Sequence, residues 1–129
     1  MTIKQISIFL ENRQGQLAGI CRALAQAGIN IATLSLADTS DFGIVRMIVD
    51  DHVRGVDVLK KAGFAVRETD VVMVTVPDKP GGMAELMEKL DRASVDIEYS
   101  YAYALCQGDK AILVFRFADN AKAEAALAN

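Results

Sequence analysis

One structural unit occurs twice in this chain of 129 residues, and the repeat limits the folds that the chain can adopt. The turn at residues 11–17 returns at residues 77–83, with 66 positions from Gly15 to Gly81. The apolar stripe of the following helix returns at the same offset, Leu17, Ile20, Cys21, Leu24 and Ala27 being matched by Met83, Leu86, Met87, Leu90 and Ala93. Both stripes have the spacing of an amphipathic helix. We therefore expect two copies of one fold, at residues 1–69 and 70–129.

The same order of elements is predicted in each copy: strand, helix, strand, strand, helix, strand. In the first copy, the strands are expected at residues 3–10, 29–36, 45–49 and 64–66, with a hairpin at 38–43 and helices that end at Gly28 and Gly63, the second capped by Asp50 or Asp51. In the second copy, the strands are expected at residues 71–76, 95–105 and 113–117, with a hairpin at 107–110 and a last helix capped by Asp119 or Asn120.

This order predicts an α+β fold of two ferredoxin-like βαββαβ units, each an antiparallel sheet with two helices on one face. Such a small unit buries little apolar surface alone, so we expect the two to pack about a pseudo-two-fold axis, through sheet edges or helices. The counterpart of strand 64–66 would fall beyond residue 129, so the second unit lacks its last strand. Either the chain stops short, or a strand from elsewhere fills that edge; an open edge would favour self-association.

Composition argues against several classes of protein. The net charge is −3 and the 14 Lys and Arg are dispersed, so nucleic acid is not an expected partner. The N-terminus has no signal-peptide pattern and no stretch is long and apolar enough to span a membrane, which predicts a cytoplasmic protein. Cys21 and Cys106 lie in apolar segments and are interpreted as structural. His52 is the only histidine and is expected at the surface or at a helix cap, so no metal site or cofactor is predicted.

The repeated turn is the best candidate for a binding site. A helix N-terminus has unpaired backbone N–H groups and partial positive charge, which attract a carboxylate or another anion. Gly15, Gly81 and Gly82 lack the Cβ that would block close approach. Asn12 and Asp78 could cap the helices or hold a ligand amine, with Arg13 and Lys79 at the rim. Alternatively, both segments are simply good strand-to-helix turns.

At these residues the chain resembles the ACT domain. The first copy has Asn12-Arg13-Gln14-Gly15-Gln16-Leu17 and then Gly28-Ile29-Asn30-Ile31, and the second has Asp78-Lys79-Pro80-Gly81-Gly82-Met83 and then Ser94-Val95-Asp96-Ile97. The resemblance implies a regulatory tandem that binds an amino acid or a similar ligand where ACT units pair. The implied ligand-binding residues are Asn12, Arg13, Gly15, Gln16, Leu17, Asn30 and Ile31, and Asp78, Pro80, Gly81, Gly82, Met83, Asp96 and Ile97.

Two departures from the pattern make the copies unequal. Gln14 replaces the usual proline of the first turn, and Asp96 replaces the asparagine seen at Asn30. An aspartate favours an ammonium group and opposes a carboxylate, so the two sites are expected to differ, and the first is the more family-like.

The leading hypothesis is therefore a non-enzymatic regulatory protein that binds a small-molecule ligand, forms a homo-oligomer such as a dimer, and regulates a protein partner. A ligand-independent dimerisation or interaction module is one alternative. An acylphosphatase-type hydrolase using Arg13 is another, although no second group that would activate water is identifiable. Tyr99, Tyr101 and Tyr103 alternate on one strand, where they could wall a pocket, join the units or simply pack across strands.

Overall fold

The computed structural model describes residues 1–11, 13–38, 41–103 and 108–128. By its internal contacts the chain divides into two compact units. We call Lys4–Thr69 the N-terminal unit, and Met1–Ile3 together with Asp70–Asn129 the C-terminal unit. The first three residues therefore belong with the C-terminal half of the chain.

The described part of the chain has the predicted α+β order. The N-terminal unit holds β1 (Thr2–Glu11) from Lys4 onward, α1 (Gln16–Gln26), β2 (Ile31–Asp38), β3 (Phe42–Val49), α2 (His52–Lys61) and the start of β4 (Ala65–Pro77). The C-terminal unit holds the rest of β4, α3 (Gly82–Arg92), β5 (Ile97–Ala102), β6 (Lys110–Phe117) and α4 (Asn120–Leu127). The predicted hairpin residues Thr39, Ser40 and Gln107 lie outside the described residues, as does Cys106.

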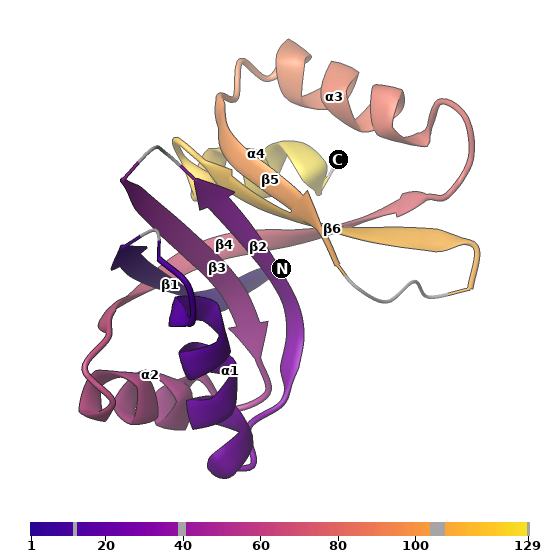
Figure 1. Cartoon of the computed structure of the whole chain (residues 1–129). Coiled ribbons are helices and arrows are strands. Elements are labelled where there is room, and N and C mark those ends of the chain that lie inside the picture. The colour runs from indigo at the N-terminus through magenta and orange to yellow at the C-terminus, as the bar shows by residue number, and fades with distance from the viewer. Residues whose placement is uncertain (12, 39–40, 104–107, 129) are drawn as a thin grey trace. The chain divides into compact units, whose positions relative to one another are not determined.

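Strand neighbours follow the ferredoxin-like pattern in each unit. The order is β2-β3-β1-β4 in the N-terminal unit and β5-β6-β4-β1 in the C-terminal unit. The pairs β1–β3, β2–β3, β4–β6 and β5–β6 are antiparallel. Figure 1 shows α1 and α2 on one face of the N-terminal unit's strands. The predicted fold is confirmed.

Each unit has its own apolar core between helices and sheet. In the N-terminal unit, Ile20 and Leu24 of α1 are fully buried against Ile6 and Ile8 of β1. These positions come from the predicted helical stripe and from alternate residues of the strand, as the periodicities of 3.6 and 2 require. Leu59 of α2 completes this core with no exposed surface.

The C-terminal core is built around two aromatic rings of β6. Phe115 and Phe117 stack with ring centroids 5.2 Å apart and planes 8° from parallel. Leu86 and Leu90 of α3, the counterparts of Ile20 and Leu24, pack in the same cluster. The repeat in sequence is thus a repeat in packing.

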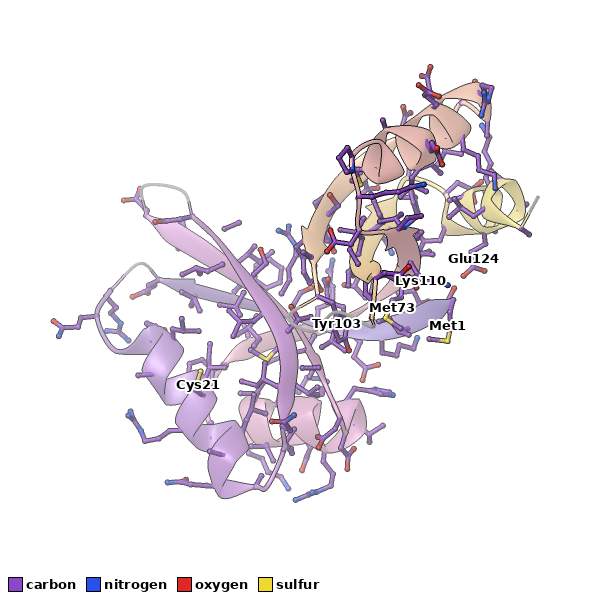
Figure 2. The ribbon with its side chains drawn as sticks, turned by 90° about the vertical axis from the view of Figure 1, so that its right-hand side faces the viewer. Met1, Cys21, Met73, Tyr103, Lys110 and Glu124 are labelled. Atoms are coloured by element: carbon purple, nitrogen blue, oxygen red, sulfur yellow. The ribbon has the colours of Figure 1, made fainter. Side chains whose placement is uncertain are left out.

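The edge that the sequence left without a strand is filled by the start of β1. Met73 of β4 donates its backbone N–H to the carbonyl oxygen of Met1 at 2.8 Å, and the Met1 nitrogen donates to the Met73 oxygen at 3.3 Å. The Thr2 hydroxyl donates to the Glu124 carboxylate of α4. Figure 2 shows Met1, Met73 and Glu124 close together. Of the two alternatives raised by the sequence, the structure has a strand from elsewhere at this edge, and it is β1.

The strands expected at residues 64–66 and 71–76 are parts of one strand, β4, of 13 residues. The residues between them include neither Gly nor Pro, so nothing interrupts the extended backbone. In the C-terminal unit, β5 begins at Ile97, two residues later than expected, and ends at Ala102, while Ala104 and Leu105 of the expected strand lie outside the described residues.

The structure shows which of the predicted residues cap α2 and α4. The Asp51 side chain accepts a hydrogen bond from the backbone N–H of Arg54, and Asp119 accepts one from Lys122. Asp50 instead accepts from the backbone N–H of Asn30 at 3.1 Å. Aspartate is favoured at both caps because its carboxylate satisfies a backbone donor of the first helical turn.

Candidate functional site

The turn before α1 ends in a glycine with left-handed backbone geometry. Gly15 is the N-cap residue of α1, with φ of 90°, a conformation that favours glycine. It brings no capping side chain, and a Cβ placed on it would meet nothing within 4 Å. The space in front of this helix N-terminus is therefore open. No side chain of the N-cap residue accepts a hydrogen bond from the first backbone N–H groups of the helix. Asn12, predicted as a cap or amine ligand, lies outside the described residues.

Arg13 lies beside this helix start and is held on two sides. Its Nε lies 3.7 Å from the Glu11 carboxylate, with both side chains about two-thirds exposed. With its amide oxygen turned toward Arg13, Gln16 accepts hydrogen bonds from Nε at 3.1 Å and from Nη2 at 3.3 Å. The predicted residues Arg13, Gly15 and Gln16 are thus brought together, with Leu17 half-buried on the following turn.

The turn before α3 has the same backbone geometry with tighter packing. Gly81 is the N-cap residue and has φ of 90°. Gly82 is buried, and a Cβ on it would lie 2.2 Å from the carbonyl oxygen of Pro77. Asp78 lies three positions before the N-cap and donates its backbone N–H to the Asp109 carbonyl at 2.8 Å. Gly81 therefore occupies the N-cap position, for which the sequence had suggested Asp78.

The remaining residues of the second turn are exposed. Lys79 and Pro80 lie at its surface, and the Met83 side chain is 41 % exposed. The backbone N–H of Gly82 donates to the Lys79 carbonyl at 3.1 Å. This turn thus satisfies one of its own donors.

Asn30 and Ile31 lie at the other end of α1 from Gly15. The helix has 11 residues, so its ends are about 16 Å apart at a rise of 1.5 Å per residue. The Asn30 backbone is tied to Asp50, which accepts from its N–H and donates to its carbonyl, each at 3.1 Å. Within the N-terminal unit, the turn and the start of β2 therefore do not face one another across one site.

Asp96 and Ile97 occupy the equivalent place after α3. The Asp96 carbonyl accepts a hydrogen bond from Ala118 at 3.0 Å, while its side chain is exposed. Both residues line a hollow of about 440 Å³ beside α3, together with Met87, Glu88, Leu90, Asp91 and Val95. The residues that line it include three carboxylates and no base. The sequence alone does not distinguish Glu88 and Asp91 as lining residues, because charged residues on a helix usually mark a solvated face.

A comparison with protein families matches residues 1–128 to the ACT domain pair. The chain belongs to this family. The match spans both units, and it confirms the resemblance seen in the repeated turns. A comparison with curated proteins gave no match.

Solved structures share the fold of this ACT domain pair. Protein BT0572 from Bacteroides thetaiotaomicron superposes with a TM-score of 0.93 and 38 % identity, covering 99 % of this chain and 88 % of that one. The ligand-free regulatory subunit of aspartate kinase from Thermus thermophilus has a TM-score of 0.71 and 16 % identity over 99 % of this chain and 93 % of that one. The corresponding subunit from Thermus flavus has a TM-score of 0.67 and 18 % identity, with 99 % and 92 % covered. The two kinase subunits, at such identities, support the fold alone.

The structure also shows where His52 and the three tyrosines, which the sequence singled out, lie in the ACT pair. His52 begins α2, and its Nδ1 lies 3.0 Å from the Glu68 carboxylate at the surface, while the neighbouring Asp51 provides the cap. Tyr99 and Tyr101 pair with Arg116 and Val114 of β6, on the face opposite the stacked phenylalanines. Tyr103 follows β5 and donates its backbone N–H to Ile112 at 2.8 Å.

The described residues include neither a metal-binding cluster nor a membrane-spanning helix. They contain no group of three or more His, Cys, Asp or Glu side chains placed to hold a metal ion. No helix among them is long and apolar enough to cross a membrane.

Proposed function

We propose that this ACT domain pair is a non-catalytic regulatory protein that binds an amino acid or a similar small ligand at the turn before α1. The observation that carries the proposal is the left-handed glycine N-cap at the same place in both units, Gly15 and Gly81. A ligand carboxylate at Gly15 would accept hydrogen bonds from the backbone N–H groups of Gln16 and Leu17 and would lie in the positive field of the helix N-terminus.

The first turn is the better site of the two. Glu11 and Gln16 already orient Arg13 beside the helix start. A ligand carboxylate could therefore pair with its guanidinium group without the entropic cost of ordering that side chain. In the second turn, the Gly82 N–H is taken by the Lys79 carbonyl. Asp78, Pro80, Gly81, Met83, Asp96 and Ile97 form the corresponding but weaker candidate set.

A ligand at Gly15 needs a second set of contacts from elsewhere. Asn30 and Ile31 lie about 16 Å away along α1 and cannot provide them within one unit. We propose that a second copy of the chain does, in a homodimer whose Asn30 side-chain oxygen accepts a hydrogen bond from the ligand's ammonium group. The ligand would then favour the paired state by its differential affinity and pass this change to a regulated protein in the cytoplasm.

A thermal-melt screen of the intact chain against the twenty amino acids tests the proposal. Saturation at about 100 times the dissociation constant should raise the free energy of unfolding by about 2.7 kcal/mol. Arg13→Gln should reduce the shift, whereas Lys79→Gln, at the matched place in the second turn, should leave most of it. If no amino acid moves the melting point at millimolar concentration, the amino-acid proposal fails and the ligand-independent interaction module takes its place.

A further inference from the structure

The residue just before β2 and the residue just before β5 are each held by the same backbone contact. In the N-terminal unit, Asp50 donates its backbone N–H to the Asn30 carbonyl at 3.1 Å. In the C-terminal unit, Ala118 donates its backbone N–H to the Asp96 carbonyl at 3.0 Å. Asp50 and Ala118 each directly precede the aspartate that caps the next helix. Asn30 with Asp50 and Asp96 with Ala118 are therefore equivalent pairs.

Each pair contains one carboxylate, but on a different member. In the N-terminal unit the acid is Asp50, whose Oδ1 accepts the backbone N–H of Asn30 at 3.1 Å. In the C-terminal unit, Ala118 offers no side-chain acceptor and the acid is Asp96 itself. The aspartate gained at residue 96 is thus matched by the aspartate lost at residue 118. Both units consequently have the same charge at the start of this strand.

Both carboxylates can receive a ligand. Asp50 and Asp96 are exposed, and Asp96 borders the hollow of about 440 Å³ beside α3, which Met87 and Val95 also line. Asp50 can accept further hydrogen bonds beside the one from Asn30, because an ionised carboxylate has two oxygens with about four lone-pair sites.

The neighbouring charges serve the helix ends instead. In each unit, the cap aspartate accepts a backbone N–H of its own helix. The basic residue of that helix, Arg54 or Lys122, donates to a carbonyl oxygen at the end of the preceding helix, at 2.9 Å in both units. This leaves Asp50 in the first unit and Asp96 in the second as the acid at the start of the strand.

We propose that these two carboxylates select the class of ligand by binding the ammonium group of an amino acid, Asp50 beside Asn30 in the first copy and Asp96 in the second. The inference rests on the function proposed above and adds Asp50 as a specificity-determining residue. A charge-assisted hydrogen bond is about twice as strong as a neutral one, so a 2-hydroxy acid, which has no cation, should bind far more weakly. The change from Asn30 to Asp96 then preserves the ammonium site.

Calorimetric titration of the intact chain with each of the twenty amino acids, and with the 2-hydroxy acid analogues of those that bind, tests the inference. The unchanged chain should bind at least one amino acid and should bind its 2-hydroxy analogue much more weakly. Asp50→Asn keeps an oxygen that can accept the Asn30 N–H but removes the charge, and it should weaken binding about tenfold. Asp57→Asn, which removes an exposed acid of α2, is the matched control and should leave the affinity unchanged.

Transfer of the second pair into the first copy separates charge from backbone support. Asp50→Ala alone should weaken binding about tenfold, like Asp50→Asn. Asn30→Asp combined with Asp50→Ala recreates the arrangement of Asp96 and Ala118, and it should restore binding to about the level of the unchanged chain. Neither variant can accept the backbone N–H of residue 30 through the side chain at position 50, so only the charge differs in this respect.

The outcomes distinguish this inference from the proposed function. Full-strength amino-acid binding by Asp50→Asn would overturn the inference, because Asp50 would then only position the Asn30 backbone. A double variant that binds no better than Asp50→Ala, or equal binding of the 2-hydroxy analogue by the unchanged chain, would also overturn it. In these cases the proposed function stands. If the unchanged chain binds none of the twenty amino acids, both fail.

Discussion

The guanidinium Nη2 of Arg54 lies 2.9 Å from the carbonyl oxygen of Ala27, the C-cap residue of α1. The C-terminal unit repeats this contact with a different cation, because the Lys122 ammonium lies 2.9 Å from the carbonyl oxygen of Ser94 after α3. Both basic residues follow the aspartate that caps their own helix. In each unit, the second helix thus supplies a positive charge to the negative end of the first.

Replacing Arg54 by methionine should lower the free energy of unfolding by about 0.5–1 kcal/mol, the usual value of a cation at an exposed helix C-terminus. Lys122→Met should have a similar cost in the C-terminal unit. Urea denaturation measures both, with Arg22→Met on the exposed side of α1 as the control. A loss for Arg54→Met no larger than for Arg22→Met would show that the contact contributes nothing.

Ser94→Gly should stabilise the protein. Ser94 has φ of 55°, the left-handed region, at the place where the first unit has Gly28 with φ of 72°. An L-residue is destabilised by about 1–2 kcal/mol in this region, whereas glycine loses about 0.5–1 kcal/mol of stability through chain entropy on folding. We expect a gain of about 0.5–1 kcal/mol for Ser94→Gly and a comparable loss for Gly28→Ser, measured by the urea midpoint. Changes of the same sign in the two variants would contradict this account.

The repeat explains how much of the fold could be predicted. The helical stripes at Leu17 and Met83, matched at one offset, predicted both helices and the order of elements around them. The alternation in β6 likewise predicted which of its residues face the core. These are local signals, since they depend only on which side of an element a residue lies.

The remaining features depend on contacts between distant residues. Nothing in the sequence near Met1 shows that it pairs with Met73, 72 positions away. Of the two roles that the sequence allowed for Asp78, helix cap or ligand of an amine, the structure does not show the first, because Gly81 with φ of 90° is the N-cap residue.

Gly82→Ala should destabilise the C-terminal unit strongly. The added Cβ would lie 2.2 Å from the Pro77 carbonyl oxygen, a backbone atom that cannot rotate away. The turn must shift, at a cost of about 1–3 kcal/mol or more. Gly19→Ala is the matched control, because its Cβ would meet only the Phe64 ring tip at 3.4 Å and alanine favours the helix by about 1 kcal/mol. Equal melting temperatures for the two variants would refute the steric argument.

Deleting Thr2 and Ile3 should uncover the edge of β4 at Met73. The shortened β1 would then stop two residues before the place opposite Met73. The two backbone hydrogen bonds between Met1 and Met73 would therefore be lost. At about 1 kcal/mol for each bond, the stability should fall by about 2 kcal/mol. Hydrogen exchange at the Met73 amide should accelerate at least tenfold, as expected for a strand that loses its partner. Thr2→Val is the control: it removes the hydroxyl that donates to Glu124 but keeps the backbone pairing, so the Met73 amide should stay protected. Rapid exchange at Met73 in the unchanged chain would show instead that β1 does not hold this edge in solution.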